Sequence, residues 1–91
     1  MGTIHINTDL LRQLGRVFYQ LNDQINSSIE PQIQNTTNQV EGDWQGVSRQ
    51  RYEQMYQDWR SATQRIVQVG EDLGRHLEDT ANRFEQADQS L

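Results

Sequence analysis

His5 and His76 are the side chains of this sequence best suited to proton transfer or metal binding near neutral pH. Asp72 lies four residues before His76, so the two would share one side of a helix. One histidine and one carboxylate do not complete the ligand set of a transition metal. No nucleophile elbow, Walker loop or dinucleotide fingerprint surrounds any serine or glycine, and cysteine is absent. The sequence therefore predicts a non-enzymatic protein with no catalytic residues, metal site or cofactor.

The remaining function is recognition of another protein through side-chain packing, and two short motifs could provide it. Trp44-Gln45-Gly46 lies at mid-chain, and Phe84 precedes Asp88 by four residues near the C-terminus. On a helix, a ring and a carboxylate at this spacing share one face, so one receptor groove can contact both. The alternative is that Phe84 only continues an apolar stripe.

Residues 8–41 have the periodicity of an amphipathic helix. Asn7 or Thr8 can cap its N-terminus, where Asp9 complements the helix dipole. Pro31 removes one hydrogen bond, but the apolar pattern stays in phase across it, which favours a kink in a continuing helix over a break. The apolar residues recur about every 3.6 positions: Leu11, Leu14, Phe18, Leu21, Ile25, Ile29, Ile33 and Val40.

The segment 42–47 is the predicted bend. Gly42 and Gly46 permit backbone angles that bulky residues avoid. Trp44, between them, is expected to lay its ring across the seam where the two helices meet and so to fix the direction of the bend.

A second helix is predicted over about 48–85, followed by a flexible tail at 86–91. Gly70 and Gly74 weaken this helix. They either permit a close approach of the two helices or mark a flexible segment, and the alternative is that both glycines are merely tolerated. Heptad spacing runs through Tyr52, Trp59, Ile66, Leu73, Thr80 and Ala87.

Composition bounds the architecture. Only 33% of the 91 residues are hydrophobic, and the mean hydropathy is -0.95. Two helices with narrow apolar stripes make a hairpin that is marginal alone, because a small chain buries little surface. We therefore predict an all-α fold, an antiparallel two-helix hairpin that dimerises into an elongated four-helix bundle. The predicted dimer and core stripe is Leu14, Phe18, Leu21, Ile25, Tyr52, Trp59, Ile66 and Leu73. Aromatic residues at helical spacing favour this interpretation over a ligand site.

Charge excludes two classes of partner. The net charge is -5, every basic residue is an arginine, and the arginines are scattered among acidic residues. A nucleic-acid binder would show a basic patch, and an anionic membrane would repel this surface. No apolar run approaches the length of a membrane span. We expect neither nucleic-acid binding nor direct membrane insertion.

Together these features closely resemble the WXG family, the early-secretory-antigen-like small helical hairpins of type VII (ESX) secretion. Three segments carry the resemblance: Trp44-Gln45-Gly46 between two helices, the N-terminal Ile4-His5-Ile6-Asn7-Thr8-Asp9-Leu10, and the tail from Leu77 to Gln89. In that family the tail holds a Tyr-x-x-x-Asp/Glu export signal. Here Phe84 stands at the tyrosine position and Asp88 at the acidic one, so the ring is kept and the hydroxyl is lost.

The resemblance implies a non-enzymatic substrate or co-substrate of type VII secretion. Such a protein is made in the cytoplasm and exported as a folded dimer without a cleavable signal peptide, through a membrane-associated FtsK-type ATPase. A chain holding both motifs resembles the homodimeric members, in which the bend of one subunit could lie beside the tail of the other. The alternatives are a heterodimer with a related small protein, a helical chaperone or adaptor of a larger toxin, and a cytosolic coiled-coil adaptor. A membrane-lytic toxin is disfavoured by the acidic charge.

Overall fold

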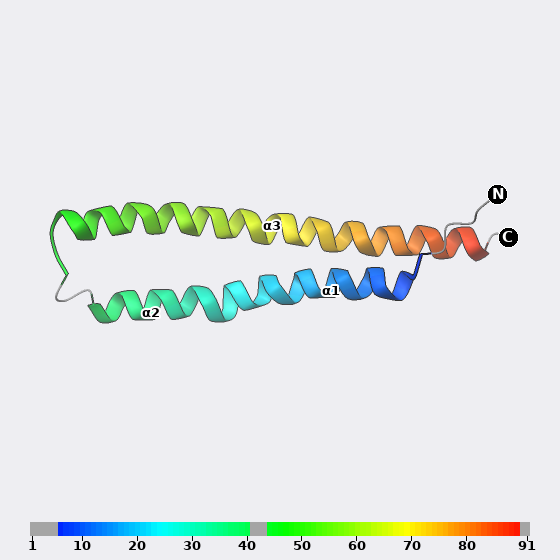
Figure 1. The fold of residues 1–91 in the computed structure, drawn as a ribbon, viewed down its shortest axis with the longest axis horizontal. Coiled ribbons are helices and arrows are strands. Elements are labelled where there is room, and N and C mark those ends of the chain that lie inside the picture. The colour runs from blue at the N-terminus through cyan, green and yellow to red at the C-terminus, as the bar shows by residue number, and fades with distance from the viewer. Residues whose placement is uncertain (1–5, 41–43, 90–91) are drawn as a thin grey trace.

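The computed structural model describes residues 6–40 and 44–89, with side chains up to residue 87. The chain folds into two antiparallel arms that form a rod of 68 × 19 × 16 Å. The first arm comprises α1 (Thr8–Gln24), the π-helical turn η1 (Ile25–Ile29) and α2 (Glu30–Val40), and the second is α3 (Val47–Gln89). The bend lies at one end of the rod and both termini lie at the other (Figure 1). The predicted antiparallel helical hairpin is confirmed.

The first arm begins with a side-chain cap. Asn7 has an extended backbone, and its Oδ1 accepts a hydrogen bond of 3.1 Å from the backbone N–H of Leu10. Asp9 adds a carboxylate in the first turn, where the helix dipole favours negative charge. These residues set the start of α1 at Thr8.

Pro31 lies within the first arm, which remains helical on both sides of it. The turn before it is π-helical, and the backbone N–H of Glu30 donates to the carbonyl of Ile25, five residues earlier. A proline in a regular α-helix clashes with the carbonyl four residues before it. The wider π turn is one of the known ways of relieving such an interruption. The hydroxyl of Ser27, inside this turn, donates to the carbonyl of Asp23.

The second arm is a single helix that runs to Gln89, past residue 85, where the sequence predicts its end. It begins after Gly46, whose φ of +100° lies in a region that residues with a side chain rarely adopt. The carbonyl of Gly46 accepts the first helical hydrogen bond, from Gln50, at 3.2 Å. Glycine at position 46 therefore lets the chain leave the bend directly into α3.

Small and polar residues, rather than large apolar ones, form the seam between the arms. Gly15 faces Gly74 so closely that a Cβ at residue 15 would lie 3.3 Å from the carbonyl oxygen of Gly74. Asn22 covers Gly70, and its Nδ2 donates 2.8 Å to the carbonyl of Val67 on α3. Of the roles open to the α3 glycines, the structure supports close helix approach.

Replacing Gly15 with leucine is expected to destabilise the hairpin by about 2 kcal/mol, because overpacking a close contact typically costs that much. The atoms nearest to the new side chain belong to the backbone of Gly74, which cannot swing aside. Thermal unfolding followed by circular dichroism measures the loss. Gln20→Leu, at an exposed position of the same helix, is the matched control. Equal melting temperatures for the two variants would contradict the close approach.

The single hairpin encloses very little. Among the described residues, Ala81 is the one buried hydrophobic side chain, with 0% of its surface exposed. The chain exposes 7401 Å², whereas a compact folded protein of 10.7 kDa exposes about 5,500 Å². The excess reflects a rod whose large apolar residues lie mostly outside the seam.

None of the helices in the described part of the chain combines the length and the hydrophobicity of a membrane span.

Candidate functional site

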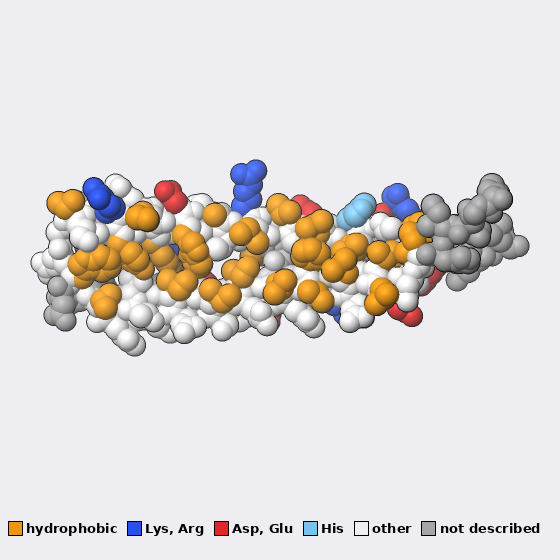
Figure 2. Space-filling view, in the orientation of Figure 1, with side chains coloured by type: hydrophobic (Ala, Val, Ile, Leu, Met, Phe, Trp, Pro, Cys, Tyr) orange, Lys and Arg blue, Asp and Glu red, His pale blue; other side chains and the backbone are white. Residues whose placement is uncertain are grey.

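An apolar face runs along one side of the rod over both arms (Figure 2). Many of its side chains are more than a third exposed, which is unusual for residues of this size. On the first arm the spacing of three or four residues keeps them on one side of the helix, and α3 repeats the pattern. These exposed residues, which define the apolar face, are Leu10, Leu14, Val17, Leu21 and Ile29 on the first arm and Met55, Trp59, Ile66, Val69 and Leu73 on α3.

A groove of about 710 Å³ lies near the middle of the apolar face, between the two arms. Its walls come from η1 and the end of α1 on one side and from the middle of α3 on the other. Gly70, which has no side chain, and Ala62 leave its α3 wall low. We call this the central groove, and its larger apolar residues are Phe18, Leu21, Ile25, Ile29, Ile66, Val69 and Leu73.

The structure gathers most of the predicted dimer and core stripe on or beside this face. Phe18, Leu21, Ile25, Ile66 and Leu73 line the central groove together. Leu14 and Trp59 are exposed on the same apolar face. Tyr52 is the exception, because its ring turns toward the bend end of the seam.

Trp44 packs against the first turns of α3. Its ring is half-buried and lies 4.9 Å from that of Tyr52, between ring centres, with the planes at 45°. The Arg49 guanidinium is 5.9 Å from the centre of the Trp44 ring, within the range of a cation–π contact. The hydroxyls of Tyr52 and Thr37 are hydrogen-bonded at 2.6 Å, which joins α3 to α2 near the bend.

A polar cluster beyond the bend escaped prediction from the sequence. The Tyr56 hydroxyl donates to Glu30 at 3.1 Å, and Arg60 contacts the same carboxylate at 3.1 Å. Burial, followed by the hydrogen bond to Glu30, raises the pKa of Tyr56. The rings of Tyr52, Tyr56 and Trp59 follow one another at 5.9 and 6.1 Å along α3. In this part of the seam tyrosine rings lie between the arms, whereas further along α3 the glycines Gly70 and Gly74 lie there.

At the other end of the rod, Phe84 is half-buried near the C-terminus of α3. The backbone is helical through residue 89, so Phe84 and residue 88 share one face of α3. The side chain of Asp88 lies outside the described residues, as does all of His5. Trp44 lies just before α3 begins and Phe84 lies five residues before its last residue, so the two are near opposite ends of this helix.

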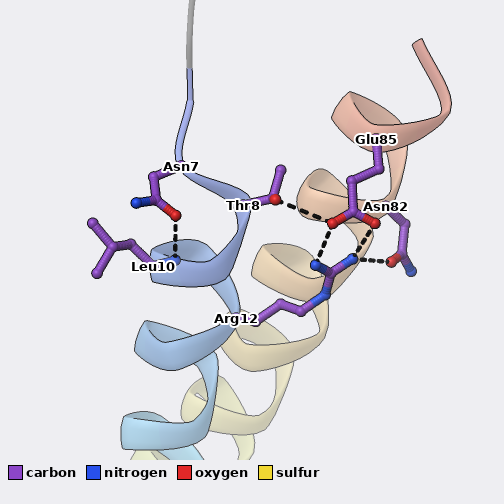
Figure 3. Close-up of polar contacts among 6 residues, drawn as sticks. All are labelled: Asn7, Thr8, Leu10, Arg12, Asn82 and Glu85. Carbon is purple, nitrogen blue, oxygen red and sulfur yellow. Dashed lines mark hydrogen bonds and ion pairs between the residues drawn. The ribbon is translucent and has the colours of Figure 1, made fainter. Parts of the chain in front are cut away.

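A clamp of four residues joins the two arms beside Phe84 (Figure 3). The Arg12 guanidinium donates to both carboxylate oxygens of Glu85, at 2.5 and 2.8 Å, and to Oδ1 of Asn82, at 2.9 Å. The Thr8 hydroxyl donates to the same carboxylate at 3.1 Å. A bidentate arginine–carboxylate pair fixes geometry better than a single contact does. We call these residues the terminal clamp.

Acid is expected to release the terminal clamp. Arg12, and next Thr8, lower the pKa of Glu85 to about 2 from its usual 4.5. In turn, the hydrogen bond to Glu85, together with the nearby Asp9 and Glu78, raises the pKa of Arg12. A carboxyl group whose pKa falls on folding stabilises above its unfolded pKa and loses that contribution as the pH falls through the folded value. The melting temperatures of the wild type and Glu85→Gln should differ steadily from pH 7 to 5 and converge toward pH 2. A difference that did not change over this range would contradict the pairing.

His76 is exposed on α3, and the described part of the chain holds no group of three His, Cys, Asp or Glu side chains placed to bind a metal ion. The surface is built for contact, with an apolar face along its length and a distinct motif at each end.

The elements described so far, a helical hairpin with an exposed apolar face, a Trp-x-Gly bend and a helical C-terminal segment, define a small all-α hairpin protein. The sequence model of the family described as "Proteins of 100 residues with WXG" (WXG100) matches residues 3–89, nearly the whole chain. The chain belongs to the WXG100 family, whose members are small secreted helical proteins and substrates of type VII secretion, not known enzymes. No curated protein and no solved structure matches it.

Proposed function

We propose that this chain is a non-enzymatic substrate or co-substrate of a bacterial type VII (ESX) secretion system, exported as a folded homodimer. The observation that carries the proposal is the uncovered apolar face, which runs over both arms of the hairpin. A second hairpin laid against it gives a four-helix bundle, the simplest way to bury such a face.

The surface area supports an obligate pairing. The chain exposes 7401 Å², about 1,900 Å² more than a compact protein of its mass. Permanent homodimers bury roughly 2,000 to 5,000 Å² in total, or about 1,000 to 2,500 Å² from each subunit. The excess surface of one hairpin is of the size that a permanent dimer removes.

An antiparallel arrangement of the two copies fits the positions of the two motifs. The central groove lies near the midpoint of both arms, so a two-fold axis through it aligns the full length of two rods. Within one chain, the bend and the tail are separated along a rod of 68 Å. Antiparallel pairing brings Trp44 and Gly46 of one subunit beside Phe84 and Asp88 of the other. The export machinery, an FtsK-type ATPase, would then meet both motifs at each end of the dimer.

The same face could instead receive a related small WXG-family protein, or a larger toxin for which this chain acts as a chaperone. The presence of both end motifs in one chain favours the homodimer. Light scattering on the purified chain separates these functions: a stable species of twice the chain mass supports the homodimer, and a monomer supports a missing partner.

Secretion is tested in the producing bacterium. We expect the protein in the culture supernatant of the wild type and its retention in cells that lack the FtsK-type ATPase of the secretion system. A cytosolic lysis marker measured in the same samples excludes leakage. Equal amounts in both supernatants, or protein in neither, would overturn the proposal.

A further inference from the structure

The terminal clamp connects a residue of α1 with the C-terminal end of α3. Resting on the proposed function, we propose that Arg12 is a positioning residue for the export signal. By holding Glu85, it keeps the tail around Phe84 helical and docked, in the shape that the secretion ATPase binds.

The position of the clamp supports this role. Glu85 immediately follows Phe84, and its two carboxylate oxygens receive three hydrogen bonds from Arg12 and Thr8, more than 70 residues away in sequence. In Figure 1, α3 extends past the start of α1. A helix end without neighbours frays, since its last turn lacks hydrogen-bond partners. The clamp lies where α3 leaves the support of α1.

Most of the other ion pairs lie within one helix, whereas the clamp joins the two arms. Between described residues, two ion pairs join the arms: Arg60 with Glu30 near the bend, and Arg12 with Glu85 near the tail. The remaining ion pairs connect residues three or four positions apart on α3. Of the arginines in these pairs, Arg12 is 27% exposed, against 62% for Arg75 and 78% for Arg83, while Arg49, beside Trp44, is 13% exposed. The clamp is thus suited to hold two segments of the chain together, and not only to pair charges on the surface of one helix.

The chemistry of Arg12 is specific. A guanidinium makes two parallel hydrogen bonds to a carboxylate and leaves an N–H for a third acceptor, here Asn82. A lysine could keep the charge but would lose the bidentate geometry. The geometry of the pair therefore predicts that Arg12→Lys is a partial loss and not a neutral change.

Amide hydrogen exchange and export are measured together on the full-length chain. Arg12→Ala is expected to raise exchange in the peptide covering residues 84–89 about fivefold and to lower the amount exported by a similar factor. Arg75→Ala, which removes an exposed pair within α3, is the matched control and should change neither quantity. The double variant Arg12→Glu with Glu85→Arg reverses the pair and should restore both.

Several outcomes decide the matter. Unchanged tail exchange in Arg12→Ala would show that the clamp does not hold the tail. Faster exchange with equal or greater export would show that the ATPase does not need a docked helix. Glu85→Gln, which is nearly isosteric, makes the same test if Arg12→Ala fails to fold. Wild-type protein that stays in the cell would refute the proposed function, while the exchange measurement would still test the clamp.

Discussion

Ile66→Asp is expected to convert the proposed homodimer into a monomer while leaving the hairpin helical. Ile66 lines the central groove and is 58% exposed in the single hairpin, so the change costs the isolated chain little. In the dimer it would bury a carboxylate without a partner, which costs several kcal/mol. Two-fold symmetry applies the cost twice. We expect the dissociation constant to rise by at least about a thousandfold.

Light scattering after size exclusion measures the mass, and circular dichroism checks the helix content. Gln64→Asp introduces the same charge at an exposed position of α3, away from the central groove, and should remain dimeric. A dimeric Ile66→Asp variant would show that the apolar face is not the interface. Loss of helix content in that variant alone would show that the hairpin depends on its partner to fold.

Phe84→Ala is expected to reduce export by at least about tenfold, because a buried aromatic anchor typically contributes more than 1 kcal/mol to a protein interface. Phe84 is half-buried on α3, so its ring is partly free to meet a receptor. Phe84→Tyr, which restores the residue of the family motif, should be exported at least as well as the wild type. Quantitative detection in supernatant and cells gives the exported fraction of each.

Gln86→Ala is the control for this prediction, since Gln86 is an exposed neighbour on the same turn. It should leave export unchanged. The mass of each purified variant separates recognition from assembly, and Phe84→Ala must remain dimeric for the result to concern recognition. Full export of a dimeric Phe84→Ala protein would assign Phe84 to the apolar packing of the rod alone.

The hairpin could be predicted because its signals are local. The glycines around Trp44 interrupt two long periodic segments, and periodicity alone fixes which residues share a side of each helix. The cap at Asn7 follows from the same short-range chemistry. Trp44 packs against Tyr52, and its role in fixing the bend stays a prediction.

The seam could not be predicted in the same way, because it does not use the largest apolar residues. Many large apolar residues are exposed on one face, while the closest contacts between the arms come from glycine, asparagine, tyrosine and charged residues. Gly15 facing Gly74 is one example, and Asn22 over Gly70 is another. Hydrophobicity marks only the exposed apolar residues. The sequence does contain a signal for the seam, which is a second periodic series of small and polar residues on α3 that begins at Tyr56.

Long-range pairs could not be predicted from the sequence either. Arg12 and Glu85 are 73 residues apart, and only the relative register of the arms brings them together. Pro31 predicts an interruption of the first arm, but not that a π turn at residues 25–29 accommodates it. The register of the two arms depends on tertiary geometry rather than on local preference.

Crosslinking between the bend and the tail tests the central claim most directly: that a second copy lies antiparallel on the apolar face. A photo-reactive side chain at Gln45, which is exposed beside Trp44, would report its neighbours by mass spectrometry. Within one hairpin, bend and tail lie at opposite ends of a 68 Å rod, so a crosslink between them must join two chains. We predict crosslinks from residue 45 to the C-terminal turns of the partner. Crosslinks to the partner's bend, or none between chains, would contradict the antiparallel dimer.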